Sequence, residues 1–523
     1  MTEPSEKPAF LTSQKRNWPT LAWERGIKLF FGGNALVAVL VLAMIMVFLV
    51  REGAGFFRQN HANLQLYRSA GLEFVEPLRE QEQTHIALSR YLFDLRVRAA
   101  EFYSNDEGLE RGEVNARLAP IDDYIYEFND AIEPLQSAVI DLSDMASEIK
   151  VEALIHAERQ GAAGGPGGGV EGIPFDFQSA RKPLYVFLPV YHDLNHQFAD
   201  RLLALVTDYE VDWPTTDINA RFERFRSLTK DYVQEFPAIE RALSEWDGDT
   251  PVPGWKAWSS FLTGSQWLTA SFWQDWYGVL PLFLGSVLVS GIALFFAVPL
   301  GLGAALYVNQ MSSRREQSVI KPAIEFIATI PSVVLGLFGI VVLGEALRVA
   351  SQQGWLEWLP GAPIAERLNA LTAGLLLALV AVPTIFTLAE DALQSVPRAF
   401  REASYALGAT RWQTIRKVIV PSAFSGMVSA VLLGFGRVIG ETMIVLLCAG
   451  NRIAIPDFTK GLEVFIQPVH TMTGIIAQEM GEVVQGGIHY RALFVVGLLL
   501  FGLTFLINYI AQRLVRRYRV SLL

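Results

Sequence analysis

Six apolar stretches, each long enough for a helix to cross a lipid bilayer, constrain the fold of this chain more than any other feature. An α-helix rises about 1.5 Å per residue, so about 20 apolar residues cross the hydrocarbon layer. The stretches cover residues 29–50, 279–308, 323–347, 371–388, 426–449 and 492–510. With 51% hydrophobic residues in a chain of 523, this pattern predicts an all-α, polytopic membrane protein with six transmembrane helices.

The distribution of charge predicts which side of the membrane each segment occupies. Residues 51–278 carry 20 Lys and Arg against 37 Asp and Glu, a net charge of −17, whereas basic clusters flank the apolar stretches elsewhere. If the N-terminus lies inside, six crossings place every basic cluster on the cytoplasmic side, in agreement with the positive-inside rule. The first stretch is too long for the core of a signal peptide and has no small-residue cleavage site, so we expect a retained anchor.

These observations predict a multi-pass protein of the inner (plasma) membrane with both termini in the cytoplasm. Its segments are a cytoplasmic tail (1–28), a first transmembrane helix (29–50), an extracytoplasmic domain (51–278), a membrane domain of five helices (279–515) and a second cytoplasmic tail (516–523). The lipid bilayer is therefore an expected partner.

The segment 51–278 is too long for a loop and reads as a large helical extracytoplasmic insert. Apolar residues recur at helical spacing over 78–100, 121–157 and 220–246. The glycine-rich run 161–172 predicts a flexible linker that divides the insert into two parts. The acidic charge argues against nucleic acid as a partner.

Two charged residues, Arg437 and Glu441, interrupt the apolar stretch 426–449. An arginine at the centre of a membrane helix costs about 2.5–3.5 kcal/mol on insertion scales, so a helix keeps one where it meets a partner or a solute. On a continuous helix, residues four apart share one face. Two interpretations follow: the charges neutralise each other within the bundle, or the arginine meets an anion that moves through the membrane.

The polar loop 390–422 contains Glu402-Ala403-Ser404, then Gly408, then Val418-Ile419-Val420-Pro421. This run resembles the EAA loop of ABC-importer permeases, whose pattern is Glu-Ala-Ala, three residues, Gly, nine residues and Ile-x-Leu-Pro. The chain departs from it in Ser404 and in the two valines. A short helix that ends at Gly408, where a left-handed cap is easiest, and a second helix beyond it predict a coupling loop; a plain amphipathic surface loop is the alternative.

Further runs extend the resemblance to the phosphate-specific permeases of ABC transporters. They are 298–307, 330–339, Glu390-Asp-Ala-Leu393, Gly436-Arg-Val-Ile-Gly-Glu-Thr-Met443, His470-Thr-Met-Thr473 and 489–494. The forms Glu-Asp-Ala-Leu and Gly-Glu-Thr-Met are more similar to the PstC subunit than to PstA. The resemblance covers about 276–515 and the first span, and leaves residues 51–250 without a counterpart.

The resemblance implies a membrane permease subunit of the ABC-importer type that carries inorganic phosphate into the cell. It implies a second related permease as heterodimer partner, a cytoplasmic ATPase dimer and an extracytoplasmic phosphate-binding protein. It assigns Arg437, Glu441 and Thr442 to the substrate pathway. It assigns coupling to the ATPase to Glu402, Ala403, Ser404, Gly408 and Pro421.

Nothing in the sequence suggests that the chain itself hydrolyses ATP or holds a cofactor. It contains no Gly-x-x-x-x-Gly-Lys-Ser/Thr phosphate loop, which favours a transport subunit over an enzyme. Two rival functions stay open: a permease for another oxyanion such as sulfate or molybdate, and a membrane sensor or receptor. A receptor should end in a cytoplasmic signalling domain, and only residues 513–523 follow the last span.

The run His192-Asp-Leu-Asn-His196 places two histidines on one face of a predicted helix. It approaches the His-Glu-x-x-His pattern of zinc sites, with Asp in place of Glu. Because the sequence offers no evident third ligand, we expect a solvated helix face and no metal site.

Overall fold

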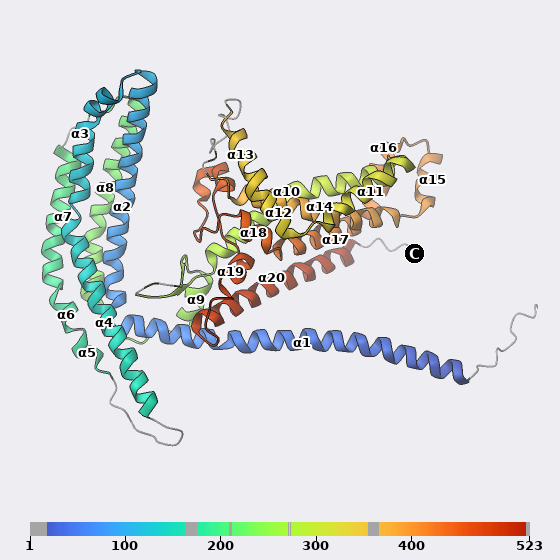
Figure 1. Cartoon of the computed structure of the whole chain (residues 1–523), viewed down its shortest axis with the longest axis horizontal. Helices are drawn as coiled ribbons and strands as arrows, with labels where there is room; N and C mark the ends of the chain where they lie inside the picture. The colour runs from blue at the N-terminus through green and yellow to red at the C-terminus, as the bar shows by residue number, and fades with distance from the viewer. Residues whose placement is uncertain are drawn as a thin grey trace, which may run out of the picture. The chain divides into compact units, whose positions relative to one another are not determined.

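The computed structural model describes residues 18–163, 175–208, 212–269, 271, 273–353, 364 and 366–518, and helices dominate these residues (Figure 1). They contain one small antiparallel sheet, in which β1 (Trp267–Leu268) pairs with β2 (Trp276–Tyr277). The chain divides into two compact units, one formed by 1–56 with 279–523 and the other by 57–278. The all-α fold predicted from the sequence is confirmed.

The first unit contains the membrane helices. They begin with the N-terminal part of α1 (Trp18–Ser69) and continue with α10 (Leu280–Gln310), α11 (Arg314–Thr329), α12 (Ser332–Phe338), η2 (Gly339–Leu343), α13 (Gly344–Ser351) and α14 (Ala370–Gln394). The remainder are α15 (Arg398–Ala406), α16 (Arg411–Thr414), η4 (Ile415–Ile419), α17 (Val420–Ile439), α18 (Met443–Cys448), η5 (Phe458–Ile466), α19 (Met472–Glu479) and α20 (Ile488–Tyr518). Six helical segments are long and apolar enough to cross a membrane, as the sequence predicts.

Helices α10, α14 and α17 form the centre of this unit, with α14 packed against both of the others. Small residues make the close approach possible. A Cβ atom at Gly374 would lie 2.5 Å from Ile292, and one at Gly301 would lie 2.9 Å from Ile385. The backbones of α10 and α14 therefore approach each other at two glycines, one on each helix.

Two predicted spans differ from the structure. The third, expected as one helix over 323–347, is interrupted between Thr329 and Ser332, and the crossing segment is Ser332–Ser351. Pro331 explains the break, because proline lacks the amide hydrogen and disfavours helical geometry in the preceding residue. Ile330 accordingly has extended backbone angles, with φ −72° and ψ 124°.

The fifth span, expected over 426–449, also contains a break. The crossing helix runs over Arg411–Ile439, and a new helix starts at Met443. Arg437 therefore lies in the last turn of α17 and not at the centre of a span. The prediction that Arg437 and Glu441 share the face of one continuous helix is wrong.

The second unit is a helical bundle. Its helices are α2 (Leu72–Glu101), η1 (Phe102–Asp106), α3 (Arg111–Asp130), α4 (Glu133–Ala163), α5 (Phe177–Ala180), α6 (Lys182–Val186), α7 (Leu188–Asp208), α8 (Thr216–Glu245) and α9 (Lys256–Leu262), preceded by the end of α1. Helix α2 packs against α3, α4 and α8, and α7 packs against α4 and α8 (Figure 1).

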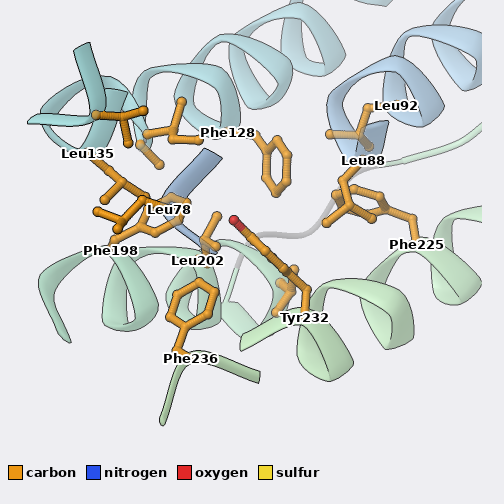
Figure 2. Packing of buried hydrophobic residues seen from close by; sticks show 14 of the residues in the cluster. Leu78, Leu88, Leu92, Phe128, Leu135, Phe198, Leu202, Phe225, Tyr232 and Phe236 are labelled. Atoms are coloured by element: carbon orange, nitrogen blue, oxygen red, sulfur yellow. The ribbon is translucent and has the colours of Figure 1, made fainter. Parts of the chain in front are cut away.

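One hydrophobic core holds this bundle together (Figure 2). It brings Leu78 and Phe128, which precede the glycine-rich run, into the same cluster as Phe198 and Phe236, which follow it. The insert is therefore one unit, and the predicted division into two parts is wrong. Residues 161–163 of the predicted linker end α4, and 164–172 lie outside the described residues.

Candidate substrate and coupling sites

Arg437 presents an exposed guanidinium at the end of α17. Its Nη1 donates a hydrogen bond to Thr384 Oγ1 on α14 at 3.3 Å. Within the described part of the chain, no carboxylate lies within 4.0 Å of this arginine. Because Thr384 is neutral and engages one donor, the other donors of the guanidinium are available to another group.

Glu441 does not pair with Arg437 in this geometry. Its Oε1 accepts hydrogen bonds from the backbone N–H groups of Thr442, at 3.2 Å, and Met443, at 3.3 Å. These are N–H groups at the start of α18, which have no acceptor within the helix. The carboxylate thus caps α18, while Thr442 Oγ1 donates to the carbonyl of Gly440 at 3.4 Å.

The start of α19 supports the break between α17 and α18. Thr473 Oγ1 donates to the Glu441 carbonyl at 2.9 Å. The start of α19 also packs on α10, where Ser286 Oγ accepts from the Met472 N–H at 2.9 Å. A Cβ atom at Gly285 would lie 2.1 Å from the His470 carbonyl oxygen, so only glycine permits this contact.

The coupling loop forms a helical hairpin. Helix α15 ends before Gly408, whose φ of +80° is left-handed, as the sequence predicts. Nothing lies within 4 Å of a Cβ built on Gly408, so backbone conformation and not space requires glycine there. Glu402 and Ala403 are exposed on α15.

Ser404 has a structural reason to differ from the alanine of the family pattern. Its buried hydroxyl lies 2.9 Å from Thr414 Oγ1 and so joins the two arms of the hairpin. Pro421 is the second residue of α17, inside the helical segment that runs over Arg411–Ile439. The wider turn η4 precedes it, and there the Val420 N–H bonds to Ile415.

A partly buried polar cluster attaches the hairpin to the membrane helices. Glu390 on α14 accepts from Lys321 Nζ on α11 at 2.8 Å and from Asn309 Nδ2 on α10 at 3.2 Å. Arg401 on α15 donates to Asn309 Oδ1 at 3.4 Å and to the Leu393 carbonyl at 3.3 Å. These contacts join α15 to α10 and α14 directly, and to α11 through Glu390.

Sequence reasoning did not assign roles to Thr384, Ser286, Thr473, Lys321 or Asn309. Glu390, His470 and Thr473 occur in the quoted runs, but only as matches to a pattern. Polar residues inside or next to apolar stretches are the signal that could have indicated them.

Residues 297–520 match the family described as "Binding-protein-dependent transport system inner membrane component". A relative in Bacillus subtilis, "Probable ABC transporter permease protein YqgH", is 34% identical over 273 residues, which are 50% of this chain and 83% of that protein. The chain belongs to this family: it is a multi-pass membrane permease subunit, not an enzyme, and ATP hydrolysis belongs to other subunits.

Two further relatives are named "Phosphate transport system permease protein PstC". The one from Haemophilus influenzae is 31% identical and covers 51% of this chain and 85% of its own length. The one from Mesorhizobium japonicum is 33% identical, and the match covers 50% of this chain and 81% of that protein. A solved structure of the MetNI methionine ABC transporter, 19% identical, covers 45% of this chain and 93% of its own with a TM-score of 0.34.

Proposed function

We propose that the chain is the PstC-like permease subunit of an ATP-driven importer that carries inorganic phosphate into the cell. The observation that supports this most is its similarity to permeases named for phosphate transport, over more than four-fifths of their length. Arg437 adds physical support. A guanidinium holds two phosphate oxygens at once and stays charged at any physiological pH.

The proposed arrangement follows the charge distribution of the sequence. Both termini lie in the cytoplasm, and the unit 57–278 lies outside the inner membrane. A second related permease completes the channel, two ATPase subunits bind at the coupling hairpin, and an extracytoplasmic phosphate-binding protein delivers the substrate. Basic clusters on one side and the acidic insert on the other support this orientation.

The proposed mechanism transmits motion from the hairpin to the pathway. ATP binding in the partner subunits displaces α15 around Glu402–Gly408. Arg401, Asn309 and Glu390 then carry the displacement to α10 and α14. Arg437 lies beside α14, held to Thr384, and stabilises phosphate as access alternates from one side to the other. Its hold must stay weak enough for release.

An uptake assay with competing anions tests the choice of substrate. The permease is reconstituted in proteoliposomes with its partner subunits, and ATP-dependent uptake of labelled phosphate is measured with excess unlabelled phosphate, sulfate or molybdate. We expect competition from phosphate alone. Equal competition from sulfate or molybdate would instead identify a permease for another oxyanion.

A further inference from the structure

We propose that His192, His196 and Glu240 bind one transition-metal ion of the Zn²⁺ class on the helical insert. His192 and His196 lie one turn apart on α7, with ring centroids 4.4 Å from each other. The structure supplies the third ligand that the sequence does not reveal, since Glu240 on α8 lies beside them. One ligand atom from each of the three residues falls within 4.8 Å of the others.

The distances between the ligand atoms suit a small metal ion, and the side chains need to move little to bind it. Bonds of about 2.0–2.2 Å to His nitrogen and carboxylate oxygen place tetrahedral ligands about 3.4 Å apart. His192 Nδ1 already lies 3.2 Å from Glu240 Oε2. The side chain of His192 is 57% exposed, so a change of its rotamer meets little resistance. Two imidazoles favour Zn²⁺ and similar ions over Mg²⁺ or Ca²⁺, which prefer oxygen ligands.

A buried chain of hydrogen bonds fixes the carboxylate. Glu240 Oε1 accepts from Asn195 Nδ2 at 2.8 Å, and Asn195 Oδ1 accepts from Gln81 Nε2 at 2.8 Å. Gln81 in turn accepts from the hydroxyl of Tyr191 through its side chain and from that of Tyr232 through its backbone. Asn195 and Gln81 are 2% and 1% exposed. Such support behind a ligand is typical of metal sites, because it orients the ligand and leaves its other oxygen available.

The site is accessible to an ion from solution. His192 and Glu240 line an open pocket of about 430 Å³, together with Pro237 and Arg241. The nearby cation Arg241 lowers the affinity for a metal ion, whereas the net charge of −17 on residues 51–278 raises the local cation concentration. Three protein ligands leave a fourth position for water, as in open zinc sites.

Metal titration of the full-length protein tests this site. The protein, purified in nanodiscs with a tag that lacks histidine, is titrated with Zn²⁺, and bound metal is counted after dialysis. We expect one Zn²⁺ per chain, with X-ray absorption that reports two imidazole ligands. His196→Gln and Glu240→Gln each weaken binding at least about tenfold, since each removes a ligand.

The controls separate this site from adventitious binding. His156→Gln removes a histidine of the same unit outside the cluster, and we expect it to bind Zn²⁺ as the unmodified chain does. The two ligand variants come from different helices, and circular dichroism verifies that each is folded. The proposal is overturned if the unmodified chain binds less than one Zn²⁺, or if His196→Gln and Glu240→Gln each bind Zn²⁺ as tightly as the unmodified chain.

Discussion

Arg437 and Glu441 lie four residues apart, yet the structure gives them different surroundings because a helix ends between them. The arginine reaches the neutral Thr384, whereas the carboxylate binds the backbone of α18. The sequence revealed both residues, since charges in an apolar stretch are conspicuous. It did not reveal the contact of Thr473, more than thirty residues further along the chain, with the Glu441 carbonyl at that helix end.

Substitution of Glu441 tests whether its role is to cap α18. Glu441→Gln retains an oxygen that accepts from Thr442 and Met443, so we expect phosphate uptake to stay close to that of the unmodified chain. Glu441→Ala loses the cap, and we expect it to destabilise the protein by about 1 kcal/mol in thermal denaturation. If Glu441→Gln instead abolishes phosphate uptake, the negative charge itself acts in the pathway.

His85 makes the helical insert sensitive to acid. Burial lowers the pKa of His85 to about 4. Its Nε2 lies 3.0 Å from the Phe128 carbonyl, and its buried Nδ1 has no partner among the described residues. The unfolded chain therefore takes up this proton more readily than the folded one. The stability from neutral His85 is complete above about pH 6.5 and is lost as the pH falls toward 4.

Hydrogen exchange measures this effect. Between pH 7 and pH 5 we expect the opening free energy of amides in α2 to fall by about 2 kcal/mol because of His85, after correction for intrinsic exchange rates. His85→Gln, which does not titrate, serves as the comparison. An equal fall in the variant would assign the acid sensitivity to other groups.

At the scale of elements, sequence patterns identified the coupling hairpin but not its attachment. Gly408 marks the end of α15 because a left-handed cap is a local property. Pro331, in contrast, ends a helix where hydropathy alone predicts a continuous one. Contacts between helices decide how the hairpin is attached. Glu390 contacts Lys321 and Asn309, which lie on two other helices, and no local sequence pattern specifies these contacts.

Substitution of Glu390 tests the attachment. Glu390→Gln leaves the partly buried Lys321 without its ion pair and loosens the contact among α10, α11 and α14. We expect ATP hydrolysis to continue while phosphate transported per ATP falls severalfold, in a reconstituted complex. Glu325→Gln on α11 removes an exposed carboxylate and is the matched control. An unchanged ratio for the Glu390 variant would remove this cluster from the coupling path.

For the molecule as a whole, length and hydropathy predict the six crossings, because a bilayer imposes one requirement on every span. They also predict that the insert is helical. They do not predict its main core, in which Leu78 packs in the same cluster as Phe198 and Phe236, far along the chain (Figure 2). The ligand set of His192, His196 and Glu240 is hidden for the same reason, since it forms only when α7 and α8 pack together.

Phosphate uptake by the Arg437→Gln variant tests the central claim most directly. The complete transporter is reconstituted, and Arg452→Gln, an exposed arginine in the loop after α18, is the control. Charge-assisted hydrogen bonds contribute about 1.5–3 kcal/mol, so we expect uptake to fall by about 10- to 100-fold in the Arg437 variant alone. Equal uptake by the Arg437 variant and the unmodified transporter would contradict the account.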